Sequence, residues 1–488
     1  MINERLKNYI FYILTAVILA LGFILRLKGY VSNPSFWLDE SALGWNVLNK
    51  SYSELFDKLR FLQIAPPLFL CFTKFLIFIT DGYHHMLRCD IVLRTIPFIA
   101  GNLSLILFYF IGKKVFTSKW TILAGLIFMA TNPALINYSF EFKPYNLDVL
   151  SCLVVILIFL NINFKQTTFK TLFLYGLILA VLPWFSFASV FVITAGFMTL
   201  SFNKENPKAF TSLLALPFVS AFFYLRIFII NAYTQNSVGM HNFWQQHFVN
   251  TNFSNSYALL NDNFKYFFMS IPDVLLLLAG ICLITGFVLI LKNKDFKYLL
   301  ITTLTFAAVI ATSILKFYPF SGRLILFLIP ISIIYIVKIT DIKKWFIGWI
   351  VILILLVPQF TFAGNFIFSK NITKGDDARY LMQNMVQRIK NKDIIVLNEN
   401  SYADYFYYNT FFNKKNKIEY IKPNYKTGED NQILLNKLQK GTYWLFLSYD
   451  NNKNRTNITE ITQWAYKNTK VLYELKTQQS ALIKLVID

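Results

Sequence analysis

The chain has 488 residues, of which 56% are hydrophobic and 15% are charged. Apolar runs long enough to cross a bilayer recur from residue 9 to residue 363, so the composition excludes a soluble globule and indicates an integral membrane protein. The formal charge of +21 does not require a nucleic-acid partner, because much of the excess Lys and Arg lies in short loops between apolar runs, where it sets membrane orientation.

The apolar runs predict about eleven membrane-spanning helices, since each has close to the roughly 20 residues that a helix needs to cross the hydrocarbon. The first run is not followed by a small-residue cleavage site, so we interpret it as an uncleaved helix and not as a signal peptide. The expected spans are 9–27, 89–111, 119–137, 144–162, 170–183, 184–202, 208–230, 272–291, 297–316, 323–339 and 345–363.

One further apolar run, at 66–80, is ambiguous because it is short, begins with two prolines and carries Lys74, which is costly inside lipid. If this run lies along the membrane surface, every basic loop falls on the same side as Arg5 and Lys7, as the positive-inside rule requires. If it spans, those loops fall outside. We therefore expect a cytoplasmic N-terminus and a long first external loop at 28–88.

Residues 364–488 differ in character from the membrane domain at 1–363. Short apolar runs such as "DIIVLN" and "TYWLFLSY" alternate there with helical text such as "ARYLMQNMVQRIK", which predicts a small α/β domain outside the cytoplasm. No G-x-G-x-x-G or Walker-type loop marks a nucleotide site in it. The cysteines and histidines of the chain lack metal-ligand spacing, so we expect neither a zinc site nor another cofactor, although the sequence does not exclude a divalent metal.

The first candidate site residues are Asp39 and Glu40 in "FWLDE", close to where the chain leaves the first span. Adjacent residues on a helix do not face the same way, so we expect one acid to point into a site while the other holds the loop through hydrogen bonds. The alternative is a solvated acidic pair with no such role.

A second candidate cluster, "YSFEFKPYNLD", contains Glu141, Lys143, Tyr145 and Asp148 at the outer end of the fourth span. Pro144 fits the first turn of a helix, so Lys143 precedes a helix N-terminus, where free N–H groups favour a phosphate. Asp148 lies about one turn further on and should point into the bundle, since facing lipid would be costly. The alternative is a Lys–Glu ion pair that only fastens the helix.

A third element, "KFYPFSGRLILFLIP", brings Tyr318 and Arg323 to the same face, and Arg94 in "RTIP" is a further basic candidate. Guanidinium groups suit phosphate because they are forked, permanently charged donors. An Arg that snorkels to the lipid headgroups is the alternative, for Arg94 above all. Carboxylates and cations outside the cytoplasm suggest group transfer from a lipid-anchored phosphate, because nucleotide-sugars are absent there and a polyprenyl phosphate can carry the activated group.

Five motifs, in their order along the chain, resemble the GT-C glycosyltransferases of the bacterial family-39 type, over about residues 1–340. They are "FWLDE", "QIAPPLFLCFTKF", "LRTIPFIAG", "NYSFEFKPYNLDVL" and "YPFSGRLILFLIP". Such proteins are similar to the protein O-mannosyltransferases and the lipid A aminoarabinose transferase. The chain has Ala65 where family members often have a His before the paired prolines, which leaves that position without its expected role.

The resemblance implies an inverting transferase that works without a bound metal in a bacterial inner membrane, with interfacial helices in its first external loop. It also implies a polyprenyl (undecaprenyl) phosphate-linked sugar as donor and a lipid, glycan or protein outside the cytoplasm as acceptor. By carry-over Asp39 is the base, Glu40 supports it, Glu141 is a second acid, and Lys143, Tyr145 and Arg323 hold the donor phosphate; we place Arg94 and Tyr318 with this substrate-binding group.

Two other function classes fit a charged helical bundle. A transporter or flippase of a lipid-linked saccharide is the main alternative, although the charged motifs gather at one face and no repeated half with broken helices is visible. A structural partner whose external domain binds cell-wall glycan is the third.

Overall fold

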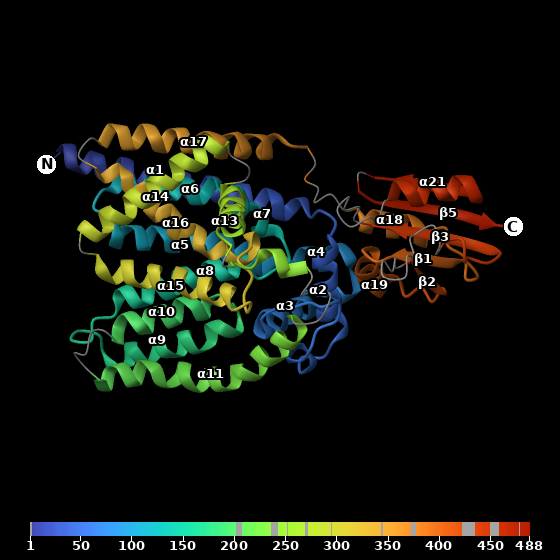
Figure 1. The fold of residues 1–488 in the computed structure, drawn as a ribbon, viewed down its shortest axis with the longest axis horizontal. Helices are drawn as coiled ribbons and strands as arrows, with labels where there is room; N and C mark the ends of the chain where they lie inside the picture. Colours follow the sequence, from blue (N-terminus) through green and yellow to red (C-terminus); the bar gives the residue numbers. More distant parts are fainter. Residues whose placement is uncertain are drawn as a thin grey trace.

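A computed structural model of the chain describes residues 2–201, 207–235, 243–250, 252–268, 272–293, 295–342, 345–370, 372, 377–421, 435–448, 458–477 and 479–488. These residues form a bundle of long helices followed by a smaller α/β domain, which lies at the end of the bundle opposite to the N-terminus (Figure 1).

The helices of the membrane domain follow the predicted apolar runs. Their bounds are α1 (Ile2–Ser32), α2 (Leu38–Asn49), α3 (Pro67–Ile79), α4 (Met86–Leu93), α5 (Thr95–Val115), α6 (Lys119–Thr131), α7 (Pro133–Asn137), η3 (Tyr138–Phe140), α8 (Tyr145–Asn161), α9 (Phe169–Val181), α10 (Ser189–Ser201), α11 (Pro207–Gln235), α13 (Phe253–Phe268), α14 (Asp273–Lys292), α15 (Phe296–Ile314), η6 (Gly322–Leu328), α16 (Ile329–Val337) and α17 (Trp345–Phe368).

Each of the eleven predicted spans is helical over most of its length, which confirms the polytopic, mainly helical fold. Within the described residues, seven helices are long and apolar enough to cross a membrane, and α6 forms an eighth with α7 and η3 across a bend of 50°. Helices α8, α9 and α10 are shorter apolar helices. The predicted total of eleven depends on counting these three and stays a prediction.

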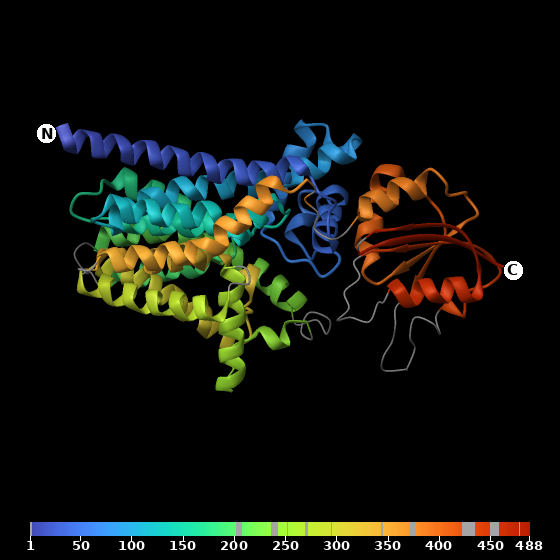
Figure 2. The same ribbon diagram turned by 90° about the horizontal axis from the view of Figure 1, so that it is seen from above.

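In the part of the chain that the structure describes, the basic residues of the loops that follow α5 and α16 lie at the N-terminal end of the bundle, as the positive-inside rule predicts, whereas most of the basic loop at 203–208 lies outside the described residues. Lys119 donates a hydrogen bond to Asn8, and Lys338 donates one to the carbonyl of Val115 at 3.2 Å. At the other end, α2 and α3 of the first long loop and the adjoining α4 lie beside the α/β domain (Figures 1 and 2). Helix α3 has 13 residues, or about 20 Å at 1.5 Å per residue, which is too short for a hydrocarbon core of about 30 Å. That length fits the predicted interfacial placement of 66–80.

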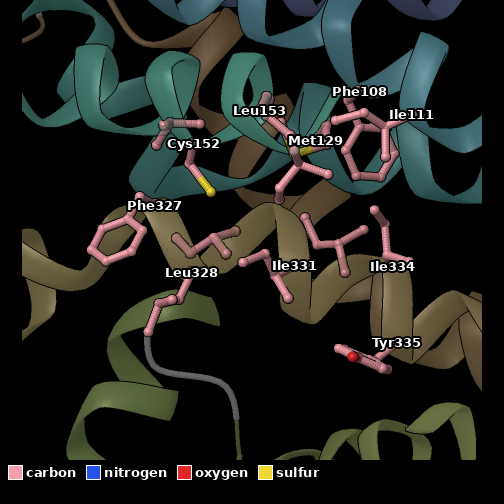
Figure 3. Close-up of a cluster of buried hydrophobic side chains, with 14 of the residues drawn as sticks. Phe108, Ile111, Met129, Cys152, Leu153, Phe327, Leu328, Ile331, Ile334 and Tyr335 are labelled. Carbon is pink, nitrogen blue, oxygen red and sulfur yellow. The ribbon is translucent and has the colours of Figure 1, made fainter. Parts of the chain in front are cut away.

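Helix α16 and the preceding η6 form the centre of the bundle, where 89% of the residues of the apolar window in 322–341 are buried. Figure 3 shows Ile331 and Ile334 of α16 packed towards side chains of α5, α6 and α8. Helix α14 approaches α16 closely at Gly286, where a Cβ atom would collide with the carbonyl oxygen of Tyr335. This core fixes η6, and with it Arg323, relative to α8.

The described residues of the C-terminal domain form a five-stranded sheet in the order β2-β1-β3-β5-β4. Strand β1 is parallel to both β2 and β3, whereas β5 is antiparallel to β3 and β4. The predicted α/β character of this region is therefore confirmed. The elements are α18 (Ala378–Val386), β1 (Ile394–Asn398), α19 (Ser401–Phe412), β2 (Ile418–Ile421), β3 (Gly441–Leu447), α21 (Ile458–Asn468), β4 (Lys470–Lys476) and β5 (Ala481–Ile487).

The two faces of this sheet have different partners, because alternate side chains of a strand point to opposite faces. Helix α21 covers one face, and α18 and α19 cover the other (Figure 2). The second face, which includes Trp444 and Phe446 of β3, shares one hydrophobic core with α2, α3 and α4. The C-terminal domain is thus packed onto the segment that carries Asp39.

Candidate functional site

Asp39 and Glu40 lie in the first turn of α2, and their side chains diverge as the sequence predicts. The carboxylate of Glu40 is fully buried, whereas the side chain of Asp39 is 19% exposed. Successive residues of an α-helix are rotated by about 100°, so the two acids cannot share a direction. Each carboxylate therefore has its own set of partners.

Glu40 forms a buried, two-pronged ion pair with Arg94 at the end of α4. Arg94 Nε and Nη2 each lie 2.8 Å from one Glu40 oxygen, and the backbone N–H of Phe142 donates to the same carboxylate at 2.7 Å. Both side chains of the pair are inaccessible to solvent. The guanidinium of Arg94, which we expected to bind substrate, is enclosed and bonded to Glu40, Asn33 and Pro34, and its role in binding substrate stays a prediction. Glu40 likewise supports the loop and is not placed to meet a substrate.

Asp39 instead joins residues that come from far later in the chain. Its Oδ2 lies 2.9 Å from Nη1 of Arg323 and 3.8 Å from Nζ of Lys143. Burial raises the pKa of the Asp39 carboxyl, but the two cations and the hydrogen bonds from Gln63 and Arg323 outweigh burial and hold this pKa below its usual range. Asp39 is consequently ionised at neutral pH. The predicted convergence of Asp39, Lys143 and Arg323 is confirmed.

Gln63 is a member of this cluster that the sequence analysis did not single out. Its amide donates to Asp39 Oδ1 at 3.4 Å, and its oxygen accepts a hydrogen bond of 2.7 Å from Lys143. The two residues before it, Phe61 and Leu62, have φ angles of 59° and 53°. Bulky residues rarely adopt this left-handed conformation, so the local sequence gives no signal for the turn that presents Gln63. Its place at the start of "QIAPP" is the one available hint.

Lys143 lies before α8, where its position next to Pro144 predicts it. The side chain is buried, with 5% of the residue exposed, and burial lowers the pKa of the amine although Asp39 and Glu141 oppose this effect. Glu141 is also buried, at 7% exposure, and its electrostatic interaction with Lys143 makes it a second acid of the same cluster. An ammonium group held in a poorly hydrated place favours an anionic ligand.

Aromatic rings surround Arg323. Its guanidinium carbon lies 5.3 Å from the ring centre of Trp37 and 5.9 Å from the ring centres of Tyr145 and Trp244. These cation–π contacts favour a charged side chain at the end of an apolar bundle. Tyr145 was expected in the site, whereas Trp244 was not singled out because the loop that carries it has no charged motif.

Tyr318 and Asp148 hold the elements of the site and do not meet it directly. The Tyr318 hydroxyl donates to the carbonyl of Leu324 at 2.7 Å, so this tyrosine fastens η6, and the expectation that it binds substrate stays a prediction. Asp148 accepts a hydrogen bond of 2.6 Å from Ser186 and is 6% exposed. The prediction that Asp148 points into the bundle is confirmed.

The site combines an ionised carboxylate, two cations and a second acid at the end of the bundle that faces the C-terminal domain. A carboxylate of this kind can accept a proton, and the cations can stabilise a phosphate group. Among the residues that the structure describes, no group of three or more His, Cys, Asp or Glu side chains is arranged to hold a metal ion.

The fold was compared with those of known proteins. No protein-family model matches the sequence, and a search of curated proteins gives no significant match. Among solved structures, the chain is similar to ArnT from Cupriavidus metallidurans in the apo state, with a TM-score of 0.58 and 8% identity over 98% of each chain. It is also similar to ArnT from this organism bound to undecaprenyl phosphate, with a TM-score of 0.54 and 10% identity over 97% of each chain.

At such low identity the similarity shows the fold alone, and it extends over nearly the whole of both chains. ArnT, a lipid A aminoarabinose transferase, has the GT-C fold. The GT-C-like membrane fold that the motifs suggest is therefore confirmed.

Proposed function

We propose that the protein is an inverting glycosyltransferase that moves a sugar from a polyprenyl phosphate to an acceptor outside the cytoplasm. The observation that carries the proposal is the cluster in which Asp39 meets both Lys143 and Arg323. A base alone does not require two cations, and a phosphate site alone does not require an ionised acid between them. Their combination fits a reaction in which a proton is taken up and a phosphate departs.

In the proposed step, an acceptor hydroxyl attacks the anomeric carbon of the donor. The acceptor proton passes to Asp39, a new glycosidic bond forms, and the bond between the anomeric carbon and the phosphate oxygen breaks. The electron pair of that bond leaves with the lipid phosphate. Lys143 and Arg323 stabilise the charge that develops on the departing group.

The donor phosphate also changes the state of the base. In the free protein both cations pair with Asp39 and hold its pKa low, which makes the carboxylate a weak base. A bound phosphate competes for the same cations, so the pKa of Asp39 rises towards the value at which proton transfer is more efficient. Donor binding and base activation are thus coupled in this proposal.

A polyprenyl donor is supported by the similarity of the fold to ArnT bound to undecaprenyl phosphate. The position of the cluster supports a reaction outside the cytoplasm. The cluster lies at the end of the bundle opposite to the N-terminus, and the basic loops assign the N-terminal end to the cytoplasm. A transporter or flippase is less well supported, because substrate sites of many transporters lie near the middle of the membrane.

The test uses purified protein in lipid nanodiscs, a panel of undecaprenyl phosphates that carry different sugars, and isolated cell envelope as the acceptor mixture. Release of undecaprenyl phosphate is measured by mass spectrometry. We expect Asp39→Asn to remove release and to retain binding of undecaprenyl phosphate. The matched control is Asp57→Asn, an exposed acid of the same loop. Full activity of Asp39→Asn would exclude the assignment of the base, and release by no donor of the panel would exclude the proposed donor class.

A further inference from the structure

Asp90, on α4, joins the C-terminal domain to the membrane domain. Its carboxylate is fully buried and accepts a hydrogen bond of 2.6 Å from the Tyr407 hydroxyl and one of 2.8 Å from Nη1 of Arg379. Tyr407 lies on α19 and Arg379 on α18, so both partners belong to the C-terminal domain. A buried carboxylate is costly without such partners, and the two bonds therefore define how the domains dock.

Arg379 also holds the segment that leads to Asp39. Its Nη2 donates to the carbonyl of Asn33 at 2.6 Å, and its backbone N–H donates to Ser35 Oγ at 3.1 Å. Asn33 has a φ angle of 40°, in the left-handed region, so the backbone turns sharply at this contact. The C-terminal domain thus binds the chain a few residues before α2 begins.

The membrane domain holds the same segment from the other side. Arg94 donates to Asn33 Oδ1 at 3.1 Å and to the carbonyl of Pro34 at 2.7 Å, in addition to its ion pair with Glu40. Residues 33–36 are therefore clamped between Arg94 of one domain and Arg379 of the other, immediately before the turn that carries Asp39.

Helix α19 packs directly on α2 (Figure 1). The Tyr407 ring lies 5.1 Å from that of Phe36, and a Cβ atom on Gly44 would come within 2.8 Å of it. The Tyr408 hydroxyl accepts a hydrogen bond of 3.0 Å from the backbone N–H of Phe36. One helix of the C-terminal domain therefore contacts both the start and the middle of the segment 36–49.

We propose that the C-terminal domain sets the position of Asp39, with Arg379 and Tyr407 as positioning residues that act through Asp90 and the segment 33–36. The consequence for catalysis rests on the proposed function, whereas the positioning itself can be measured without turnover. Misplacement of a reacting group by about 1 Å can cost a hundredfold in rate, so loosening this clamp should lower kcat.

The experiment compares full-length wild-type protein with Arg379→Ala, Arg379→Lys and Tyr407→Phe in nanodiscs. Hydrogen–deuterium exchange is followed in residues 36–49, and kcat and KM are measured with the donor that the wild type accepts. Arg388→Ala is the matched control, because Arg388 follows the same helix but donates to Asn384 and lies over the Tyr473 ring within its own domain.

We expect Arg379→Ala to speed exchange in 36–49 and to lower kcat by about tenfold or more while KM changes less than twofold. Arg379→Lys should restore part of kcat, and Arg388→Ala should match the wild type. Tyr407→Phe keeps the ring packing and removes the hydroxyl that contacts Asp90 and Cys89, so it gives a smaller effect of the same sign and serves if Arg379→Ala fails to fold.

Unchanged exchange in 36–49 in a folded Arg379→Ala variant would overturn the inference, and so would faster exchange with an unchanged kcat. If neither the wild type nor any variant turns over a donor, the proposed function fails, but faster exchange in 36–49 would still support the positioning by Arg379.

Discussion

Nη1 of Arg323 lies 2.9 Å from the carboxylate of Asp39, although one residue belongs to η6 near the end of the membrane domain and the other to α2 near its beginning. Lys143 and Gln63 complete the cluster from two further segments. Three other stretches of chain therefore converge on the carboxylate of Asp39. Both cations also interact with Glu141, so an anionic ligand would bind Lys143 and Arg323 in competition with two carboxylates.

We predict that Arg323→Gln weakens the binding of undecaprenyl phosphate by about 10- to 100-fold, because a hydrogen bond to a charged group contributes about 1.5–3 kcal/mol. Arg323→Lys should lose less affinity for undecaprenyl phosphate, since lysine keeps the positive charge but lacks the forked pair of guanidinium donors. Binding is measured by native mass spectrometry, with undecaprenol, which lacks the phosphate, as the second ligand.

The control for the two Arg323 variants is Arg226→Gln. Arg226 forms an exposed ion pair with Asp57, in which 71% of the Arg226 side chain and 50% of the Asp57 side chain are exposed. Such surface pairs contribute little, so this variant should bind like the wild type. An equal loss of undecaprenol binding in Arg323→Gln would show that Arg323 does not act on the phosphate.

The pH dependence of turnover should report the low pKa of Asp39. A base must be ionised, so kcat/KM falls as the pH drops through the pKa of Asp39 in the free protein, and we expect this acidic limb below the ordinary range of an aspartate. Lys143→Gln removes one of the two cations that lower the pKa, so the limb should move to higher pH. In the wild type, kcat should show its limb at higher pH than kcat/KM, because the bound donor phosphate occupies the cations.

The lowered pKa of Asp39 also makes the stability of the folded protein depend on pH in a defined direction. A carboxyl group whose pKa is depressed by folding stabilises the folded state above its unfolded pKa, and this stabilisation is lost as the pH falls through the folded pKa. Lys143→Gln should therefore reduce the loss of stability on acidification below the ordinary aspartate pKa of about 3.9. Superimposable acidic limbs of wild type and Lys143→Gln would contradict the electrostatic role of Lys143.

Glu40→Ala should destabilise the protein strongly, by about 3–5 kcal/mol, because it leaves the buried guanidinium of Arg94 without its counter-charge. The expected result is a lower temperature of thermal unfolding in detergent. Glu54→Gln is the control, since Glu54 is an exposed acid of the same loop that bonds to Ser51. Unfolding of Glu40→Ala at the wild-type temperature would show that the pair contributes little.

Much of the fold follows from the sequence because about 20 apolar residues in a row have few alternatives to a helix across the membrane. The convergence of Asp39, Lys143 and Arg323 could be predicted because charged groups at a membrane boundary need partners. Sequence alone could not separate Arg94 from Arg323. Both lie in short motifs at the outer end of a predicted span, and only the tertiary contacts show that Arg94 is enclosed with Glu40 while Arg323 lies among aromatic rings.

The residues that sequence reasoning missed depend on contacts between distant segments. Gln63 is presented by two residues in a conformation that their side chains disfavour, and no local pattern announces it. The ion pair between Arg379 and Asp90 joins the C-terminal domain to the membrane domain, although the composition of the two domains suggests that they are independent. An α/β domain can be predicted from alternating apolar runs, but its docking face can be identified only when the partner surface is known.

The orientation of the chain can be tested by labelling intact cells with a membrane-impermeant thiol reagent. We expect Ser53→Cys, in the first long loop, to react and Lys114→Cys, in a basic loop, to be protected until the membrane is permeabilised, because the positive-inside rule places the basic loops in the cytoplasm. Both positions are exposed on the protein. The background carries Cys71→Ser, since Cys71 is partly exposed while the other three cysteines are buried. Labelling of Lys114→Cys without permeabilisation, with Ser53→Cys protected, would invert the assignment and move the Asp39 cluster to the cytoplasmic side, where a nucleotide-sugar could serve as donor.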